Sequence, residues 1–369
     1  MRYFETKPAA GFEFADISYE KGDWVARITI SRPHNYNAYS TRALDELAAA
    51  FRDASFDDQI AVIVFTGAGH MAFCTGGDVK EYEANYTQTP RDYWKYMGLF
   101  KAYIESIVNS GKPVIARLNG MAVGGGNESQ LACDLSVMAQ HAFIAQVGTN
   151  VGSVACGGST QWLPITVGDR RAREILLLND RIPAQQALEW GLVNRVAPSV
   201  TKDGQFIEQA SAEEIKKAQK EQDGYAIDLS RLDETVDDLV QKLIRKFPEC
   251  SRYTKQNINF WKDLAWHQTI GHARDWLSIH YASWEPLEGM QAFVEKRPAD
   301  YLKLRELAAA GKSSEFKWGP YTQLCPNCGA SGIPAEFNYC GVCGTPLNGS
   351  DGLEHSSPTS AAEGDQDAT

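Results

Sequence analysis

The stretch Gly120-Met121-Ala122-Val123-Gly124-Gly125-Gly126-Asn127-Glu128 decides the fold class, because it joins a strand-like run to helix-forming sequence through three consecutive glycines. The run before it, Pro113-Val114-Ile115-Ala116-Arg117-Leu118, is rich in β-formers and is typical of a buried strand. Glycine at such a turn leaves bare backbone N–H groups that can point at a ligand atom. The stretch therefore predicts a strand-turn-helix unit whose turn can bind a ligand.

A second glycine turn of the same kind lies upstream, in Phe73-Cys74-Thr75-Gly76-Gly77-Asp78. It follows the strand-like run Ala61-Val62-Ile63-Val64-Phe65-Thr66 and also precedes helix-like sequence. Two backbone donors that converge on one oxygen make an oxyanion hole. The pair of turns therefore predicts a site that stabilises an enolate.

The first half of the chain predicts an α/β fold. Residues 12–198 alternate strand-like runs with helical segments, which implies βα units with largely parallel pairing. The segment from Thr41 to Asp53 illustrates the helices, and Ser40 or Thr41 can cap it. Its apolar residues share one helical face: Leu44, Leu47, Ala48 and Phe51.

The remainder of the chain divides by composition into four parts. Residues 199–235 are polar and charged, which predicts an exposed insertion with some helix rather than core. Residues 236–315 regain helical periodicity with many aromatic side chains, and predict a C-terminal helical region. Residues 320–347 hold four cysteines, and residues 348–369 are rich in Gly, Ser, Asp and Glu, for which we expect disorder.

The four cysteines predict a small zinc-ribbon module. Cys325 and Cys328, then Cys340 and Cys343, form two CxxC pairs, and a glycine after each pair allows a tight turn. Four thiolates fill a tetrahedral zinc ion and leave no open position, so the predicted ion is structural. Disulfides are the competing interpretation, which the lack of a secretory signal disfavours. A module this small needs the metal to fold, and it serves either as an appendage or oligomer contact or as a docking site for a partner.

Charge and hydropathy exclude two classes of partner. The chain has 369 residues and a formal net charge of −11, which argues against nucleic-acid binding because that binding draws its affinity from phosphate neutralisation. It has no apolar run long enough to span a membrane, and its N-terminus lacks the apolar core of a signal peptide. We expect a cytoplasmic enzyme without a membrane partner.

The order and spacing of the two turns, together with Ser31-Arg32-Pro33, Ala132-Cys133-Asp134 and Gly191-Leu192-Val193-Asn194-Arg195-Val196, resemble the crotonase (enoyl-CoA hydratase/isomerase) superfamily. The resemblance spans roughly residues 12–305 and implies a ββα spiral core over residues 12–198. It implies an acyl-CoA thioester as substrate, with coenzyme A as part of that substrate. It also implies a homotrimer or homohexamer.

Matched residue by residue, the resemblance implies the roles of the site. The backbone N–H groups of Thr75 and Gly125 would bind the thioester oxygen, and Glu128 would be the acid/base. A buried carboxylate near an apolar acyl pocket has a raised pKa, which suits that role. Tyr281 resembles a tyrosine that the naphthoyl-CoA synthase branch lends to a neighbouring subunit's site. Substrate and coenzyme contacts are expected from Gly76, Gly77, Asp78, Gly124, Gly126, Gln146, Gly148 and Lys296.

The segment after Phe143 separates the branches of the superfamily. Gly148 occupies the place of the second glutamate of ordinary hydratases, which weakens simple hydration by two glutamates. The surrounding pattern resembles the 6-oxocyclohex-1-ene-1-carbonyl-CoA hydrolase and 1,4-dihydroxy-2-naphthoyl-CoA synthase branches. The run Val154-Ala155-Cys156 lacks the aspartate of the synthase and favours the hydrolase branch.

That branch implies a function on an alicyclic β-oxo enoyl-CoA, to which water is added before the ring is opened through a thioester enolate. Three alternatives stay open. The first is a hydratase or isomerase for an ordinary enoyl-CoA or a cyclic dienoyl-CoA, with Glu128 as the sole acid/base. The second is a cyclase like the naphthoyl-CoA synthase. The third is a catalytically silent scaffold that docks through its zinc ribbon.

Overall fold

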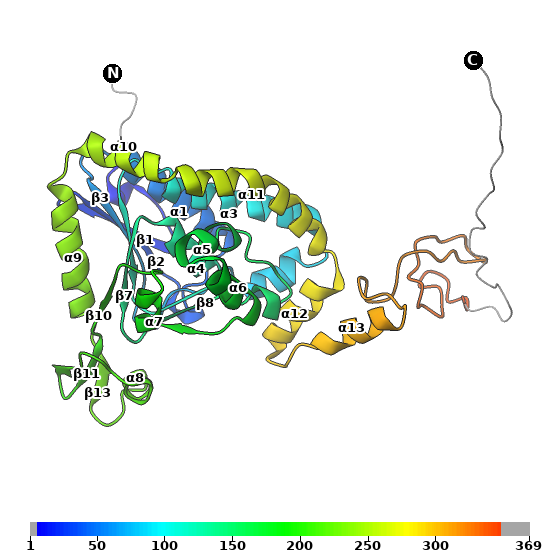
Figure 1. The fold of residues 1–369 in the computed structure, drawn as a ribbon. Coiled ribbons are helices and arrows are strands. Elements are labelled where there is room, and N and C mark those ends of the chain that lie inside the picture. The colour runs from blue at the N-terminus through cyan, green and yellow to red at the C-terminus, as the bar shows by residue number, and fades with distance from the viewer. Residues whose placement is uncertain (1–5, 348–369) are drawn as a thin grey trace, which may run out of the picture. The chain divides into compact units, whose positions relative to one another are not determined.

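The computed structural model describes residues 6–347, which fall into two compact units that divide between Asp300 and Tyr301 (Figure 1). The tail for which disorder was expected, residues 348–369, lies outside the described residues. The other domain boundaries expected from the sequence stay predictions. Each unit is described by itself below.

The larger unit is built around a six-stranded sheet in the order β1-β2-β3-β5-β7-β10. β1 pairs with β2 antiparallel, and every later pairing in this sheet is parallel. β3 and β5 are buried along their whole length, as the two apolar runs predict. The strands are β1 (Ile17–Gly22), β2 (Val25–Ile30), β3 (Val62–Gly67), β5 (Val114–Leu118), β7 (Leu135–Ala139) and β10 (Arg195–Ala197).

A second, four-stranded sheet has the order β4-β6-β8-β9. Its strands are β4 (Ala72–Cys74), β6 (Met121–Val123), β8 (Phe143–Ala145) and β9 (Ile182–Pro183). Along the chain, β3, β5 and β7 each enter the large sheet, and the strand that follows each of them enters the small one. The repeated unit is therefore strand, strand, helix, which confirms the predicted ββα spiral.

Helices close the repeats. Ser40 caps α1, since its side chain accepts a hydrogen bond from the Ala43 N–H at 3.0 Å. The helices of the core are α1 (Thr41–Phe56), α2 (Val79–Glu81), α3 (Pro90–Val108), α4 (Gly125–Ala132), α5 (Ser159–Val167), α6 (Asp169–Leu178) and α7 (Ala184–Glu189). Short turns of other helix types are η1 (Ala9–Gly11), η2 (Pro33–Asn35), the π-helical η3 (Tyr82–Tyr86) and η4 (Gly148–Asn150).

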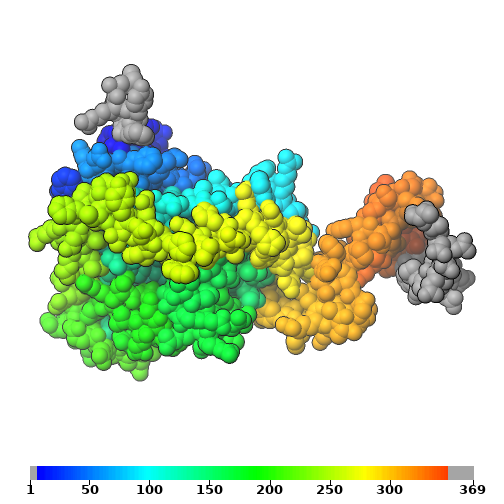
Figure 2. Space-filling model, turned by 45° about the horizontal axis from the view of Figure 1, so that its top comes forward, coloured from blue at the N-terminus to red at the C-terminus, as the bar shows by residue number. Residues whose placement is uncertain are grey.

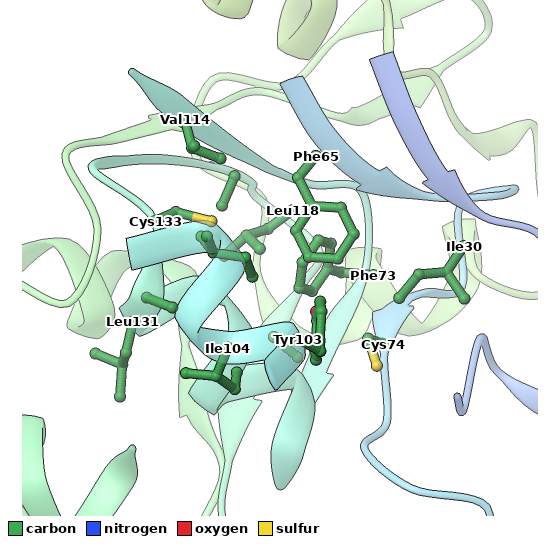
Figure 3. Packing of buried hydrophobic residues seen from close by; sticks show 14 of the residues in the cluster. Ile30, Phe65, Phe73, Cys74, Tyr103, Ile104, Val114, Leu118, Leu131 and Cys133 are labelled. Carbon is green, nitrogen blue, oxygen red and sulfur yellow. The ribbon is translucent and has the colours of Figure 1, made fainter. Parts of the chain in front are cut away.

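The core between the two sheets fixes the place where the two glycine turns meet. Figure 3 shows Phe65 of β3, Phe73 of β4 and Tyr103 of α3 packed together. The Phe65 and Phe73 rings meet edge to face with centroids 5.1 Å apart. Leu131 of α4 is also buried in this cluster. The end of β4 and the start of α4 therefore rest on one packed layer.

The polar insertion contains a sheet that its composition does not predict. β11 (Val200–Lys202) pairs antiparallel with both β12 (Gln205–Phe206) and β13 (Tyr225–Ile227). The expected helix is present as α8 (Ala212–Ala218). Val200 and Ala218 are buried, so this segment has a small apolar contact of its own.

Four helices follow in the larger unit: α9 (Ser230–Ile244), α10 (Pro248–Ile258), α11 (Phe260–His280) and α12 (Trp284–Glu295). Figure 2 shows this region, in yellow, lying across the segment around α3 in cyan and the later repeats in green. Trp266 of α11 stacks on Trp162 of α5 with ring centroids 5.2 Å apart. The Lys262 ammonium donates to the Leu131 carbonyl at 2.6 Å, at the end of α4.

The smaller unit, described as far as residue 347, begins with α13 (Tyr301–Ala309) and continues in turns and single β-bridges. Its buried apolar residues are Cys325, Ile333 and Cys340, with Phe337 packed against them. Such a small core predicts that something other than burial holds this unit together.

Candidate active site

The two glycine turns meet backbone to backbone. Gly76 has φ +86°, and a Cβ built on it would lie 2.8 Å from the backbone nitrogen of Gly125. A Cβ on Gly126 would collide with the Cys74 carbonyl oxygen. Both turns therefore need glycine for their close approach, which is what the sequence predicts.

A cavity of about 100 Å³ opens where the turns meet. Thr75 and Gly125, the predicted oxyanion donors, both line it. For scale, an apolar cavity of about 150 Å³ can hold a benzene molecule. The predicted site residues that the structure brings to its wall are Thr75, Gly76, Gly77, Gly124, Gly125, Glu128, Gln146 and Gly148.

Besides Tyr281, which is described below, three predicted residues are not part of this wall. Asp78 caps α2 by accepting from the Lys80 N–H and forms an ion pair with Arg32, with an N–O distance of 3.1 Å. Gly126 is buried in α4 beneath the cavity. Lys296 follows α12 in the left-handed conformation, and its side chain is exposed. Asp78 therefore caps a helix and pairs with Arg32, and Gly126 allows close packing, so neither residue contacts the cavity in this structure.

Glu128 lies in the first turn of α4 and is buried, with 6 % of its surface exposed. Its Oε1 accepts hydrogen bonds from the backbone N–H groups of Gly157 at 2.9 Å and Ser159 at 3.3 Å. Burial raises its pKa from 4.5 to about 7, although the two N–H donors oppose the shift. A carboxyl with this pKa can both give and take a proton near neutral pH.

No second carboxylate reaches the cavity among the described residues that line it. Gly148, at the place of the second hydratase glutamate, opens the short turn η4. A Cβ built on Gly148 would lie 2.9 Å from the Ser153 carbonyl oxygen. The loop therefore leaves no room for a side chain at this position without a backbone shift.

Gln146 lines the cavity and has a buried acceptor atom without a partner. Its Nε2 donates to the Ser159 hydroxyl at 2.6 Å and to the Gly124 carbonyl at 3.3 Å, which fixes the orientation of the amide. Within residues 6–347 its Oε1 has no hydrogen-bond partner, and the side chain is 1 % exposed. A buried acceptor without a partner is costly unless a water or ligand group completes it.

Tyr281 lies behind the wall of the cavity in its own chain. Its hydroxyl donates to the Ser153 hydroxyl at 3.3 Å, and Ser153 lines the cavity. Its ring stacks on Tyr93 with centroids 3.5 Å apart, and burial raises its pKa to about 12. The resemblance implies a tyrosine lent to a neighbouring subunit, whereas this geometry places the phenol beside the site of the same chain.

Several wall residues were not among the sequence predictions. Tyr93, Tyr96 and Phe100 of α3 line the cavity, as do Tyr82 before that helix and Met290 of α12. The α3 residues are three and four positions apart, a spacing that places them on one helical face. This periodicity is visible in the sequence, but nothing in it says that the face meets the two glycine turns.

One wall of the cavity is held by direct backbone contact with α12. A Cβ on Gly152, which has φ +68°, would collide with the Glu285 carbonyl group. A Cβ on Gly289 would collide with the carbonyl group of Val151. Two glycines thus allow the loop before Ser153 and the helix that carries Met290 to touch without intervening side chains.

The four cysteines of the smaller unit come together as a metal-binding group. Their sulfur atoms all lie within 4.8 Å of one another, with 3.6 Å between Cys325 and Cys343 and 3.7 Å between Cys328 and Cys340. A tetrahedron with Zn–S bonds of about 2.3 Å has edges of about 3.8 Å. These separations fit one ion, and they are far longer than a disulfide bond.

The backbone of the cysteine pairs has the expected tight turns. Gly329 and Gly344 have φ of +71° and +74°, and their N–H groups donate to the carbonyls of Cys325 and Cys340 at 3.0 and 2.9 Å. The prediction that these glycines permit the turns is confirmed. The site fits a tetrahedral metal ion by its donor set and its spacing.

Two sheets joined through ββα repeats, with a cavity where two glycine turns meet, define the class of fold. A family model described as enoyl-CoA hydratase/isomerase matches residues 20–222. The chain belongs to this family, the crotonase superfamily, and is an enzyme of its acyl-CoA hydratase/hydrolase class.

Two curated relatives are similar over most of the chain. A Geobacter metallireducens protein named 6-oxocyclohex-1-ene-1-carbonyl-CoA hydrolase is 34% identical, over 84% of this chain and 87% of its own length. A Thauera aromatica protein of the same name is 33% identical, over 86% of this chain and 89% of its own. A crystal structure of an enoyl-CoA hydratase from Mycobacterium avium subsp. paratuberculosis has a TM-score of 0.62 at 24% identity and covers 78% of this chain and 98% of its own.

Within the part of the chain that the structure describes, no helix is both long and apolar enough to span a bilayer. The homotrimer or homohexamer, the cytoplasmic location and the coenzyme contact of Lys296 stay predictions.

Proposed function

We propose that the enzyme adds water to, and then opens, an alicyclic β-oxo enoyl-CoA of the 6-oxocyclohex-1-ene-1-carbonyl-CoA type. The proposal is carried by one observation: a single buried carboxyl, Glu128, with a pKa of about 7, lines the same cavity as the two backbone donors. The names of the relatives support the choice of acyl group.

In the proposed complex the thioester oxygen accepts hydrogen bonds from the N–H groups of Thr75 and Gly125. The ring enters the cavity beside the two turns. Backbone donors fixed by packing strengthen as the oxygen becomes negative, because they need no reorganisation during the reaction. Binding energy is thus directed at the enolate rather than at the ground state.

Hydration comes first. The Glu128 carboxylate takes a proton from a water molecule whose oxygen bonds to the β-carbon, and the electrons of the double bond move into the thioester enolate. The same carboxyl then returns a proton to the α-carbon. The Gln146 Oε1, an acceptor without a partner in the described residues, would orient the attacking water once a small rotation of the side chain exposes it to the cavity.

Ring opening follows by a retro-Claisen step. A second water bonds to the ring ketone carbon and gives its proton to Glu128. The bond between this carbon and the α-carbon then breaks, and its electrons again form the thioester enolate in the same oxyanion hole. Protonation of the enolate leaves a linear hydroxyacyl-CoA with a terminal carboxylate. Tyr281, acting through Ser153, is the proposed donor of this last proton, and the proton that Glu128 took from the second water then passes through solvent to restore the phenol.

Anoxic incubation of the purified protein with 6-oxocyclohex-1-ene-1-carbonyl-CoA tests the proposal. Mass spectrometry is expected to show a product heavier than the substrate by two water molecules. A product heavier by one water, or turnover of crotonyl-CoA or a cyclic dienoyl-CoA without ring cleavage, would favour a hydratase or isomerase. Coenzyme-A binding with no turnover of any thioester would favour the scaffold.

We propose zinc as the ion of the cysteine group, because four thiolates select a soft ion with tetrahedral geometry. The ion would be structural, since four protein ligands leave no position for a substrate. Elemental analysis of the purified protein, with one zinc expected per chain, tests the assignment.

A further inference from the structure

Two tyrosine hydroxyls lie against the first glycine turn. Tyr82 begins the π-helical turn η3 and Tyr96 lies in α3, and both side chains line the cavity. Their Oη atoms are 2.6 Å apart, which is a hydrogen bond. A Cβ on Gly77 would collide with the Tyr82 hydroxyl and lie 2.9 Å from that of Tyr96. The pair is therefore seated beside Gly77, two residues after the oxyanion donor Thr75.

The pair has one hydrogen more than it uses. Each phenol carries one O–H, and one of the two hydrogens is consumed between Tyr82 and Tyr96. Neither hydroxyl makes a further hydrogen bond within the described residues. Burial raises the pKa of both phenols well above the usual value, so both are neutral donors at physiological pH. One O–H is left without an acceptor among the described residues, and both tyrosines line the cavity.

The surrounding rings hold the pair in place. The Tyr82 ring meets the Tyr96 ring edge to face, with centroids 5.1 Å apart, and the Tyr281 ring at 6.2 Å. The π-helical turn closes with the Thr87 N–H donating to the Tyr82 carbonyl at 2.9 Å. Single π-helical turns are rare and occur frequently at functional sites. The donor is therefore preorganised rather than mobile.

We propose that the Tyr82–Tyr96 pair donates this hydrogen bond to the ring oxo group of the substrate, and so selects ketone-bearing rings. The inference rests on the proposed function. In a β-oxo thioester one carbon separates the ketone carbon from the thioester carbonyl, so a ketone near Gly77 is compatible with a thioester oxygen at Thr75. When water bonds to the ketone carbon, negative charge forms on the ketone oxygen, and the phenol stabilises it before the ring bond breaks.

Phenylalanine variants test the pair. Because either phenol alone still carries a donor, Y82F and Y96F are each expected to lower kcat/KM for ring opening by about threefold, and Y82F/Y96F by about a hundredfold. Hydration of cyclohex-1-ene-1-carbonyl-CoA, which lacks the ketone, is expected to stay within about threefold of wild type in all three. Tyr103→Phe is the matched control, because that hydroxyl lies on the same helix but donates to Ser129 outside the cavity.

Binding separates this inference from the proposed function. The wild type is expected to bind 2-oxocyclohexane-1-carbonyl-CoA about tenfold more tightly than cyclohexane-1-carbonyl-CoA, and Y82F/Y96F to lose that preference while still binding the second compound. Suppose that Y82F/Y96F loses the binding preference but the wild-type enzyme opens no ring. That result would overturn the proposed function and leave the role of the tyrosine pair intact. Retention of both the preference and ring opening in Y82F/Y96F would overturn the role of the pair, as would additive single-variant effects.

Discussion

Each of the two compact units has its own kind of internal stabilisation. In the larger unit a layer of buried side chains, including Phe65, Phe73 and Leu131, fixes the ends of β4 and α4 that form the cavity. In the smaller unit the buried set that the structure describes is Cys325, Ile333 and Cys340, two of which are metal-binding cysteines. If the larger unit is stabilised by apolar area and the smaller by the proposed metal ion, chemical perturbations should separate them.

Metal removal is expected to have the largest effect. A strong chelator, or Cys325→Ser, should unfold residues 320–347, because a structural zinc contributes on the order of 10 kcal/mol to such modules. Hydrogen exchange should rise in that segment and stay unchanged in β5 and α4. Cys250→Ser is the control, since Cys250 is an exposed thiol outside the cysteine group. Undisturbed protection of residues 320–347 without metal would mean that burial alone holds this unit.

Glu128→Gln tests the larger unit next. The amide keeps the shape and the acceptor for Gly157 and Ser159 but cannot exchange a proton, so kcat is expected to fall by about a thousandfold. Circular dichroism should show an unchanged fold. Full turnover by this variant would remove Glu128 from the mechanism.

The same variant gives a stability difference that depends on pH. The folded-state pKa of Glu128 is raised from 4.5 to about 7, so the protonated form is favoured by folding. Its stability contribution is fully present below pH 4.5 and is lost as pH rises to about 7. Relative to Glu128→Gln, the wild type should lose about 3 kcal/mol of unfolding free energy between pH 4.5 and pH 8. Urea unfolding of both proteins across this pH range measures the difference in unfolding free energy. A difference that does not change with pH would contradict a raised pKa for Glu128.

The smallest predicted effect is on kcat/KM, and it comes from comparing alanine variants of two glycines. Gly76→Ala and Gly69→Ala both place a side chain at positive φ, +86° and +77°. Gly69 faces open space, whereas the new methyl at Gly76 meets the Gly125 nitrogen. We expect Gly76→Ala to lower kcat/KM by about ten- to a hundredfold, and Gly69→Ala to lower it by less than about threefold. Equal losses in both variants would assign the effect to backbone strain rather than to the oxyanion site.

The sequence predicts the features that depend on local chemistry. Glycine is required where Gly76 meets Gly125, Ser40 caps α1, and the cysteine pairs need Gly329 and Gly344, so each is visible as a short pattern. The α/β class follows from the alternation of buried strands and helices, whereas the ββα order was implied by the family resemblance. These predictions succeed because each depends on a few neighbouring residues.

Features that depend on distant packing were not predictable in the same way. The strands of the insertion are only two or three residues long, too short to show a period of two in the sequence, so the pairing of β11 with β13 is set by the fold around them. Whether Tyr281 serves its own chain or a neighbouring subunit depends on how α11 and α12 turn and on the assembly, and its catalytic role stays a prediction. The Tyr82–Tyr96 contact depends on a π-helical turn, which single-sequence periodicity does not reveal.

The contact of Gly152 and Gly289 with the facing backbones has a consequence for redesigning the enzyme. Because no side chains separate the loop from α12, neither segment can retreat to admit a bulkier ring without losing the other's support. Room for a different acyl group must come from trimming protruding side chains such as Met290 or Leu277. Laboratory evolution toward larger thioesters should therefore accumulate substitutions at these two helical positions and leave both glycines untouched.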